Sequence, residues 1–276
     1  MENCRLDTEV RRRFSWKKGR NAVASAEAGR ELIVLPNTTQ VYETAARMIY
    51  DLALKAMQKS GRFTIALSGG TTPQALYELL AENYRKKLPW EQIYLFWGDE
   101  RCVPPEHPDS NFRMVRASLL DKVPIPSANI FPMPAAGPEP ERNAAGYEAL
   151  LRKFFKTEDG TVPRFHLVLL GLGSDGHTAS IFPHTAAVDE KKRLVMLSSA
   201  VGSNQMRMTL TLPVINQAEN ILFLVTGANK AAVLRDVFYG AFRPGELPAQ
   251  GVRPQNGKLV FVLDQQAAAG ICQVEE

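Results

Sequence analysis

Short apolar runs alternate with longer segments of mixed polarity along this chain. The runs predicted to be strands are Glu31–Leu35, Phe63–Leu67, Ile93–Trp97, His166–Leu170, Arg193–Leu197, Met206–Leu212, Ile221–Val225 and Leu259–Leu263. Helices are predicted over residues 38–59, 73–83, 110–121, 141–155 and 228–238. Continuous apolar strands separated by helices are typical of a mostly parallel sheet with helices on both faces. The pattern therefore predicts an α/β fold.

Four of the predicted strands are followed by loops rich in glycine and polar residues. These loops are SGGTTP (68–73), GDER (98–101), GLGSDGH (171–177) and TGANK (226–230). In parallel sheets, ligands bind at the carboxyl ends of the strands, where such loops gather. We therefore expect all four loops at one edge of the sheet, around a single site.

The loop SGGTTP connects a predicted strand to a predicted helix. Glycine allows a sharp turn, and successive backbone N–H groups at a helix start form a nest for a phosphate dianion. Ser68, Gly69, Gly70 and Thr71 are therefore candidate phosphate ligands. An ordinary tight turn with a threonine as helix cap would give the same pattern, and the lysine of the Walker motif is missing.

Residues 171–176, GLGSDG, match the GxGxxG spacing of dinucleotide-binding loops. Such a site requires a long helix directly after the loop and an acidic residue at the end of the next strand. Pro183 limits any helix here to about two turns, and Asp189 and Glu190 stand outside a predicted strand. The sequence context argues against a nucleotide, and we expect no cofactor.

Asp175 and His177 form the most informative pair in the sequence. Histidine takes up a proton near neutral pH, and a carboxylate two residues away could hold the imidazole in the productive tautomer. The pair follows two glycines at the expected sheet edge, which favours a functional role. We assign structural roles to His107, His166 and His184, because none of them has such a setting.

Further polar candidates follow other strands. Arg101 could bind a phosphate or carboxylate in bidentate fashion, and Asp99 lies in the same loop, although a surface ion-pair cluster would look alike. Asn111 could cap the next helix or face the site. Arg207 lies in a predicted strand. Lys230 opens a predicted helix, where a cation opposes the helix dipole, and this indicates a nearby anion.

The net charge of +4 is confined to the N-terminal segment. Residues 1–30 contain eight Lys/Arg and four acids, so residues 31–276 carry no net charge. A neutral body has no overall field to attract nucleic acid, and we expect no nucleic-acid partner. We predict that residues 1–30 form a disordered, basic extension and that residues 31–276 form a single catalytic domain.

Cysteine usage and hydropathy favour a reducing, aqueous compartment. The cysteines Cys4, Cys102 and Cys272 are widely spaced and odd in number, so we expect neither a disulfide framework nor a zinc site. No apolar run approaches the roughly 20 residues needed to cross a bilayer, and the N-terminal segment lacks the apolar core of a secretory signal. We expect a cytoplasmic protein that binds no membrane.

Together these motifs resemble those of the 6-phosphogluconolactonase family, which is related to the glucosamine-6-phosphate deaminases. The resemblance extends from about Leu35 to Ala269. It is carried, in chain order, by SGGTTP, WGDERCVPPEHPDSN (97–111), GLGSDGHTASIFP (171–183), RMTLTLP (207–213), TGANKA (226–231) and LDQQAA (263–268). The sequence departs from the family pattern at His184, where glycine is common, and at Phe261, where tryptophan is common.

The resemblance implies a modified Rossmann-like fold, similar to glucosamine-6-phosphate deaminase, and a metal-independent ester hydrolase of the oxidative pentose phosphate pathway. Its substrate would be the sugar phosphate 6-phospho-D-glucono-1,5-lactone, and we expect it to act as a monomer. By position, His177 would be the general base, Asp175 its orienting partner, and Arg101 a neighbour of the carboxylate or phosphate. The phosphate ligands would be Ser68, Gly69, Gly70, Thr71, Arg207 and Lys230.

Three other interpretations compete with lactone hydrolysis. The related deaminases carry a glutamate after the DGH turn, typically in an NEP tripeptide, whereas SIFPH (180–184) stands here. A non-catalytic sugar-phosphate sensor would usually carry a helix-turn-helix domain, which residues 1–30 are too short to supply. Ser174 and Ser180 could act as nucleophiles, but neither lies in a GxSxG elbow.

Overall fold

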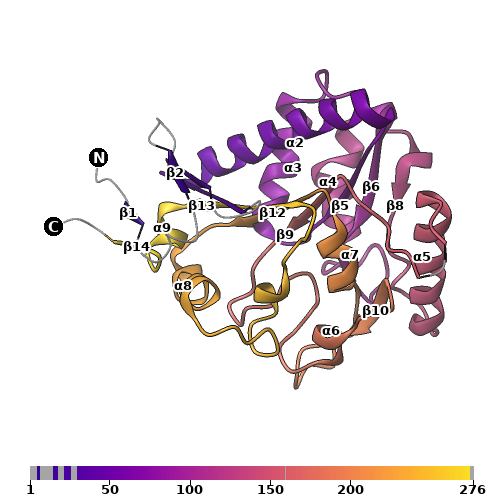
Figure 1. Ribbon diagram of the computed structural model, residues 1–276. Helices are drawn as coiled ribbons and strands as arrows, with labels where there is room; N and C mark the ends of the chain where they lie inside the picture. Colours follow the sequence, from indigo (N-terminus) through magenta and orange to yellow (C-terminus); the bar gives the residue numbers. More distant parts are fainter. Residues whose placement is uncertain (1–4, 7–14, 18–21, 26–29, 159, 274–276) are drawn as a thin grey trace.

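The computed structural model describes residues 5–6, 15–17, 22–25, 30–158 and 160–273, and a large β-sheet lies at its centre (Figure 1). Within this described part, the strand order is β2 (Ser15–Lys17), β3 (Ala22–Ser25), β4 (Arg30–Leu35), β13 (Lys258–Asp264), β12 (Asn220–Val225), β9 (Leu167–Leu170), β5 (Phe63–Leu67), β6 (Ile93–Trp97) and β8 (Ile130–Phe131). All pairings from β4 to β8 are parallel, whereas β2, β3 and β4 pair antiparallel. The predicted mostly parallel sheet is confirmed.

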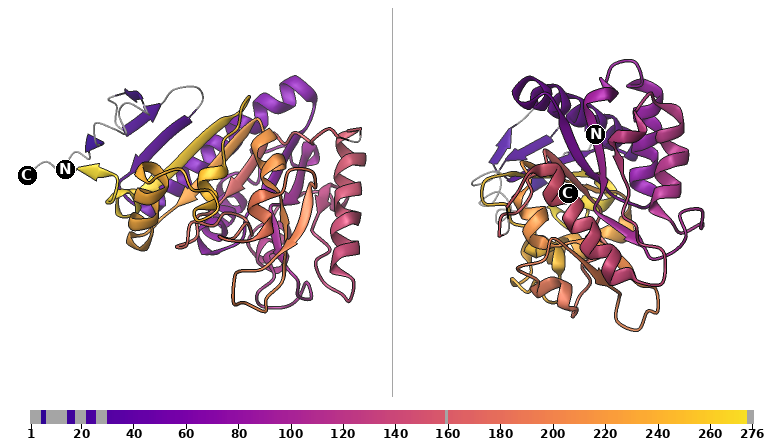
Figure 2. Two further views of the ribbon diagram at one scale, coloured as in Figure 1. Left: turned by 60° about the horizontal axis from the view of Figure 1, so that its bottom comes forward. Right: turned by 90° about the vertical axis from the view of Figure 1, so that its right-hand side faces the viewer.

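Helices cover both faces of this sheet, and this burial explains the continuous apolar runs in the sequence. The long helices α2 (Thr38–Ser60) and α3 (Thr71–Asn83) lie on one side, and α7 (Leu212–Gln217) and α8 (Ala231–Tyr239) on the other (Figures 1 and 2). Every residue of β5 and β9 is buried. Helix α2 buries a stripe of small residues at helical spacing: Val41, Ala45, Ala46, Ile49, Ala53 and Ala56.

The predicted helices are present, with shifted ends. The remaining ones are α4 (Asn111–Ser118), α5 (Pro140–Phe155), α6 (Ala186–Asp189), α9 (Gln265–Ala268) and the short 3-10 helices η2 (Trp90–Gln92), η3 (Leu120–Lys122), η4 (Ser127–Asn129), η5 (Ala228–Lys230) and η6 (Pro248–Gly251). Helix α3 begins at Thr71, two residues before the proline expected to open it. Asn37 caps the start of α2, since its side chain accepts from Gln40 N at 3.0 Å.

A second, smaller sheet corrects part of the sequence interpretation. The strands β10 (Val195–Ser198), β11 (Arg207–Leu210) and β7 (Asp99–Arg101) pair antiparallel in that order, apart from the main sheet. We predicted GDER to be a loop, yet most of it forms β7. The reason is non-local pairing: Gly98 N donates to Leu67 O, and Gly98 O accepts from Leu210 N, both at 2.8 Å.

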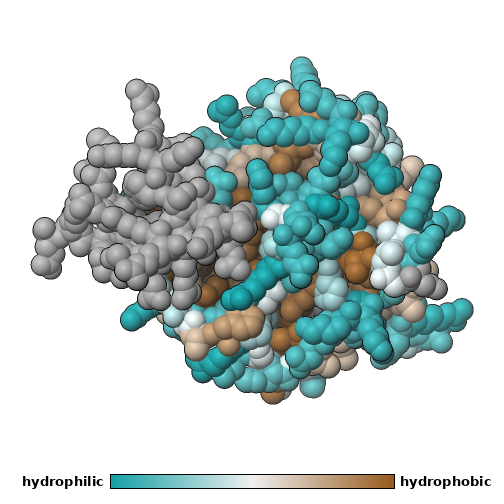
Figure 3. Space-filling model, in the orientation of Figure 1, coloured by the Kyte–Doolittle hydropathy of each residue, from teal (hydrophilic) through white to brown (hydrophobic). Residues whose placement is uncertain are grey.

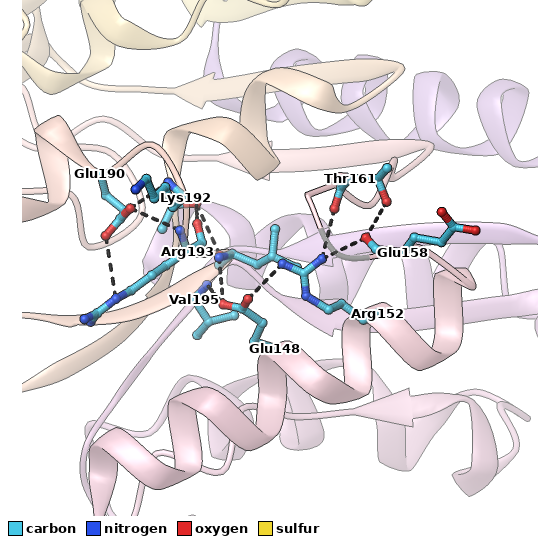
Figure 4. A network of polar contacts seen from close by, with 10 residues as sticks. Glu148, Arg152, Glu158, Thr161, Glu190, Lys192, Arg193 and Val195 are labelled. Atoms are coloured by element: carbon cyan, nitrogen blue, oxygen red, sulfur yellow. Dashed lines mark hydrogen bonds and ion pairs between the residues drawn. The ribbon is translucent and has the colours of Figure 1, made fainter.

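Helix α5 fixes the start of β10 through a polar network (Figure 4). The Glu148 carboxylate accepts from Leu194 N at 2.8 Å and from Val195 N at 3.4 Å. Arg152 donates to the other oxygen of Glu148 at 3.0 Å and to the carbonyl of Thr161 at 3.1 Å. These hydrogen bonds therefore fix the position at which the small sheet attaches to α5.

The expected N-terminal extension, residues 1–30, lies mostly outside the described residues. Its described parts are β1 (Arg5–Leu6), β2, β3 and the first residue of β4. Strand β1 pairs with β14 (Cys272–Gln273), and β3 pairs with β4. The boundary between extension and domain stays a prediction.

Seen from the side shown in Figure 3, the surface of the described residues is mainly polar. Hydrophilic side chains dominate the face shown in Figure 3, and apolar side chains appear there in smaller patches. None of the described helices combines the length and the apolar character that a bilayer crossing requires.

Candidate active site

The four segments singled out in the sequence, three loops and the GDER segment that forms β7, follow the carboxyl ends of main-sheet strands, as predicted. Three of them follow the neighbouring parallel strands β5, β9 and β12, and the fourth follows β6. Contacts join the loops: Thr72 and Thr226 hydroxyls lie 3.1 Å apart. A Cβ placed on Gly171 would lie 3.9 Å from Ser68 Oγ. The loops after β5, β9 and β12 therefore converge on one place.

His177 and Asp175 form a close pair in the loop that follows β9. The imidazole Nδ1 lies 2.5 Å from Asp175 Oδ1, and His177 N donates to the same oxygen at 3.1 Å. A carboxylate at Nδ1 holds the hydrogen there and leaves Nε2 as the acceptor. The side chain of His177 is 27% exposed, so water can reach it. The geometry suits a general base.

The electrostatics of this pair favour an ionised carboxylate. Burial acts to raise the pKa of Asp175, but the His177 charge and the hydrogen bonds from His177 outweigh it. The pKa of Asp175 is therefore lowered below its ordinary value of 3.8. An anion at this position stabilises the imidazolium that forms when His177 takes up a proton.

Asp175 and His177 belong to the segment 171–183, which we call the catalytic loop. Two positions of this loop require glycine. A Cβ at Gly173 would collide with the His177 ring and the Asp175 carboxylate. Gly176 has a φ of +83°, in the left-handed region that favours glycine, and its carbonyl accepts from Ala249 N at 2.9 Å. In the described structure no helix follows GLGSDG until α6, so the long helix that a dinucleotide-binding loop requires is not found directly after it.

Ser180 attaches the catalytic loop to the small sheet. Its N–H donates to Thr209 Oγ1 at 3.2 Å, and its hydroxyl donates to Asp99 Oδ2 at 2.6 Å. Ser180 is fully buried, so its hydroxyl is not accessible to act as a nucleophile. Its described contacts give it a positioning role. Ser174 is exposed, and no hydrogen bond joins it to His177 among the described residues.

Asp99 and Asn111, which we predicted to contact substrate, lie beneath the site. They are 6% and 2% exposed, and the Asn111 amide donates to Asp99 O at 2.9 Å and to its carboxylate at 3.4 Å. The Asn111 side chain also occupies the space that a Cβ on Gly69 would need. Their described contacts are internal, so they position the SGGTTP loop against the small sheet.

Glu100 is a functional support that sequence reasoning missed. Its carboxylate accepts from Asn111 N and Phe112 N at 2.7 Å and from Arg101 N at 2.8 Å, so it caps the start of α4. Burial raises the pKa of Glu100, although these three N–H groups act to lower it. Its partners lie up to 12 residues away, where the fold packs the start of α4 against β7.

Arg101 and Arg207 lie side by side on β7 and β11. Arg101 Nη1 donates to Asp109 O at 2.5 Å, and Arg207 Nη2 donates to Gln205 Oε1 at 3.3 Å. Within the described residues, neither guanidinium forms an ion pair with a carboxylate. Burial and the nearby Arg101 charge lower the pKa of Arg207. The two cations are therefore suited to an anion from outside the protein.

Phe182, also missed, connects the base to this cation pair. Its ring centroid lies 4.7 Å from that of His177, and Arg207 Cζ lies 5.3 Å from the same centroid. Phe182 is 3% exposed. Phe182 lies within the motif GLGSDGHTASIFP, but the motif did not indicate this contact, because a phenylalanine beside a proline resembles any core residue.

The predicted phosphate loop is held from below by a buried tyrosine. Tyr77 hydroxyl donates to Ser68 O at 2.8 Å and accepts from Ser68 N at 3.0 Å. Gly70 has a φ of +102° and precedes the first residue of α3, Thr71. Lys230 ends η5, immediately before α8, and no described carboxylate pairs with it. A glycine turn, a helix start and a cation are therefore present at this edge.

The other histidines make structural contacts. His166 Nδ1 accepts from Thr64 N at 3.1 Å, and burial lowers the pKa of His166. His107 Nδ1 accepts from Asp109 N at 3.1 Å. His184, where the family pattern favours glycine, has a φ of +58°, a value that glycine adopts more readily. Among the described residues, no three His, Cys, Asp or Glu side chains group as metal ligands.

Comparison with known proteins gives a consistent picture. The family model described as glucosamine-6-phosphate isomerases/6-phosphogluconolactonase matches residues 36–261. A 6-phosphogluconolactonase of Synechocystis sp. is 48% identical over 238 residues, 86% of this chain and 97% of that protein. The structure of 6-phosphogluconolactonase from Trypanosoma brucei matches with a TM-score of 0.77 at 31% identity, covering 87% of this chain and 98% of that one. A monomeric glucosamine-6-phosphate deaminase shares the fold, with a TM-score of 0.73 at 18% identity over 87% and 99% of the two chains.

Proposed function

This chain belongs to the family of glucosamine-6-phosphate isomerases and 6-phosphogluconolactonases, and we propose that it hydrolyses 6-phospho-D-glucono-1,5-lactone to 6-phosphogluconate with His177 as general base. This reaction belongs to the oxidative pentose phosphate pathway. The observation that carries the proposal is the Asp175–His177 pair, 2.5 Å apart, at the sheet edge that also presents Arg207 and Lys230, which form ion pairs with none of the described carboxylates. Hydrolysis of a sugar-phosphate lactone needs both features: a base near the lactone carbonyl and cations around the phosphate group.

A δ-lactone is an activated ester, so hydrolysis needs no covalent intermediate. His177 Nε2 takes a proton from water as the water oxygen attacks the lactone carbonyl. The tetrahedral intermediate then collapses, the bond from carbon to the ring oxygen breaks, and the imidazolium returns the proton to that oxygen. Asp175 keeps the imidazole in the required tautomer and stabilises its charged form.

The negative charge that develops on the carbonyl oxygen needs hydrogen-bond donors. The backbone of the catalytic loop and Arg101 are the candidates. Gly173 N donates to His177 O at 2.8 Å, and Gly176 N donates to Gly173 O at 3.1 Å, so both are used within the loop. These internal bonds favour the guanidinium of Arg101 as the oxyanion donor.

The phosphate end of the substrate would occupy the donors at the start of α3. We assign its ligands as Ser68, Gly69, Gly70, Thr71, Arg207 and Lys230. The support for this assignment is chemical: a backbone nest at a helix start suits a dianion. In the described structure, Arg207 and Lys230 also lack carboxylate partners that would neutralise them.

A direct lactonase assay tests the proposal. The purified protein is mixed with fresh 6-phosphogluconolactone, and the rate is corrected for spontaneous hydrolysis. We expect enzymatic turnover that needs no added cofactor. A corrected rate of zero would leave the chain a sugar-phosphate binding protein, the sensor alternative.

Deaminase activity is the second candidate, because the family includes such enzymes and the fold is shared. The segment 180–184, SIFPH, offers no glutamate where the deaminases carry one. Incubation with glucosamine 6-phosphate should therefore release no ammonia. Release at a rate comparable to lactone hydrolysis would overturn the assignment.

The compartment and the oligomeric state are inferred from charge and composition. We infer a cytoplasmic monomer that binds neither nucleic acid nor membranes. The support is the neutral charge of residues 31–276 and the sparse cysteines. Gel filtration with light scattering would test the monomer, and an elution at twice the mass would contradict it.

A further inference from the structure

One row of side chains crosses the small sheet of β10, β11 and β7. Ser198 pairs with Arg207, and Arg207 pairs with Arg101. Directly paired residues in an antiparallel sheet point to the same face, so these three side chains project together. The sheet thus presents a hydroxyl and two guanidiniums side by side, which we call the donor row.

The donor row faces the catalytic loop. Thr209 and Asp99 each lie two positions along their strand from a member of the row, and alternation along a strand places them on the same face. Both accept hydrogen bonds from Ser180, at 3.2 and 2.6 Å. The loop that carries the general base therefore packs on this face, beside the donor row.

Two donors in the row have no hydrogen-bond partner among the described residues. They are the hydroxyl of Ser198, which is 6% exposed, and Nε of Arg101. A buried polar group without a partner is unfavourable, so such groups normally bind something. Their common direction points to an acceptor that arrives from outside the chain.

Repulsion within the row favours an anion as that acceptor. Burial and the charge of Arg101 together lower the pKa of Arg207. The charges of Asp99, Asp109 and Asp175 offset this only in part, and no described carboxylate forms an ion pair with either guanidinium. A bound dianion would relieve the repulsion, and it would offer oxygens to the Ser198 hydroxyl and to the forked guanidinium of Arg207.

We propose that Ser198 is a ligand of the substrate's phosphate group, donating a hydrogen bond to an oxygen that Arg207 also contacts. This inference deepens the proposed function and rests on it, because it names a further contact in the same site. Ser198 stands in no family motif quoted above. Glu148 fixes the start of β10 at Leu194, and the pairing of Ser198 with Arg207 sets the other end of the strand.

The experiment compares Ser198→Ala with Ser199→Ala, a neighbouring hydroxyl that lies outside β10. Calorimetry with inorganic phosphate measures binding without turnover, and lactone kinetics give KM and kcat. For Ser198→Ala we expect phosphate affinity to fall and KM to rise by about tenfold, the usual effect of losing one hydrogen bond to a charged group. The kcat should stay within about twofold, and Ser199→Ala should match the wild type.

Two further measurements separate this role from a structural one. Ser198→Ala should not lower the melting temperature, because its hydroxyl has no described partner to lose. Inhibition by gluconate, which lacks the phosphate, should be unchanged. Unaltered phosphate affinity, weakened gluconate inhibition or a lowered melting temperature would each overturn the inference. Wild-type protein that binds phosphate but hydrolyses no lactone would instead overturn the proposed function.

Discussion

His177 and Arg207 contact the same aromatic ring, that of Phe182, from separate parts of the chain. The imidazole centroid is 4.7 Å and the guanidinium carbon 5.3 Å from the ring centroid. The base comes from the loop after β9 and the cation from β11, so the ring sets their separation. Phe182 thereby links the reacting end of the site to its anion-binding side.

Replacing Phe182 with leucine should disturb both functions at once. The imidazole and the guanidinium would each lose a packing surface, so kcat should fall and KM should rise, each several-fold. The core would lose about 1 kcal/mol of stability, as for similar hydrophobic exchanges. Steady-state kinetics and urea unfolding measure these effects.

Phe155→Leu is the matched control for that variant. Phe155 packs in an aromatic cluster against Phe165, with centroids 4.8 Å apart, away from the catalytic loop. It should lose comparable stability with unchanged KM and kcat. Equal kinetic losses in both variants would show that Phe182 acts only through general stability.

Gly173→Ala should inactivate the enzyme through the position of the base. The new methyl group would occupy the space of the His177 ring, so the Asp175–His177 geometry cannot persist. We expect kcat to approach that of a variant lacking the base. Gly146→Ala is the control, because open space surrounds Gly146 on α5 and alanine there should add about 0.5–1 kcal/mol of stability. A Gly173→Ala enzyme with wild-type kcat would contradict the geometry.

The lowered pKa of Asp175 predicts how stability changes in acid. A carboxylate with a depressed pKa in the folded state contributes stability above its unfolded pKa, 3.8, and this contribution is lost as pH falls through the lower folded value. Asp175→Asn lacks the titration, so the difference in unfolding free energy between wild type and variant should shrink below 3.8. Urea titrations on both sides of that pH measure it. A difference independent of pH would contradict the assigned interaction.

Cys102 should be a slow nucleophile at neutral pH. Burial, followed by the charges of Glu100 and Glu141, raises its pKa to about 11. The thiolate is the reactive form, so alkylation should be slow near neutrality and accelerate up to about pH 11. A Cys4→Ser/Cys272→Ser variant isolates this thiol for timed reaction with iodoacetamide. Reactivity at neutral pH equal to that of free cysteine would contradict the raised pKa.

The sequence allowed the main sheet and its loops to be predicted, because both depend on local pattern. Apolar runs marked the parallel strands, and Gly-rich segments after them marked the site edge. Asp175 and His177 were visible because their contact spans two residues. For such features, short-range spacing fixes the three-dimensional relationship.

The small sheet and its contacts could not be predicted in this way. Whether Arg207 pairs with Arg101 depends on strand register between segments a hundred residues apart, which no local pattern encodes. The burial of Asp99 and Asn111 follows from the same pairing. In the sequence, Glu100 and Ser198 cannot be told from other polar residues. Only the folded structure shows that Glu100 lies against the start of α4 and that Ser198 lies beside Arg207.

The most direct test of the account is the hydrolysis of 6-phosphogluconolactone by the wild type and by His177→Ala, each corrected for spontaneous hydrolysis. General base catalysis contributes about 10²–10⁴-fold, so kcat of the variant should fall by that factor. Its affinity for inorganic phosphate should stay that of the wild type, because the cations are untouched. A variant that hydrolyses the lactone at the wild-type rate would remove His177 from the mechanism.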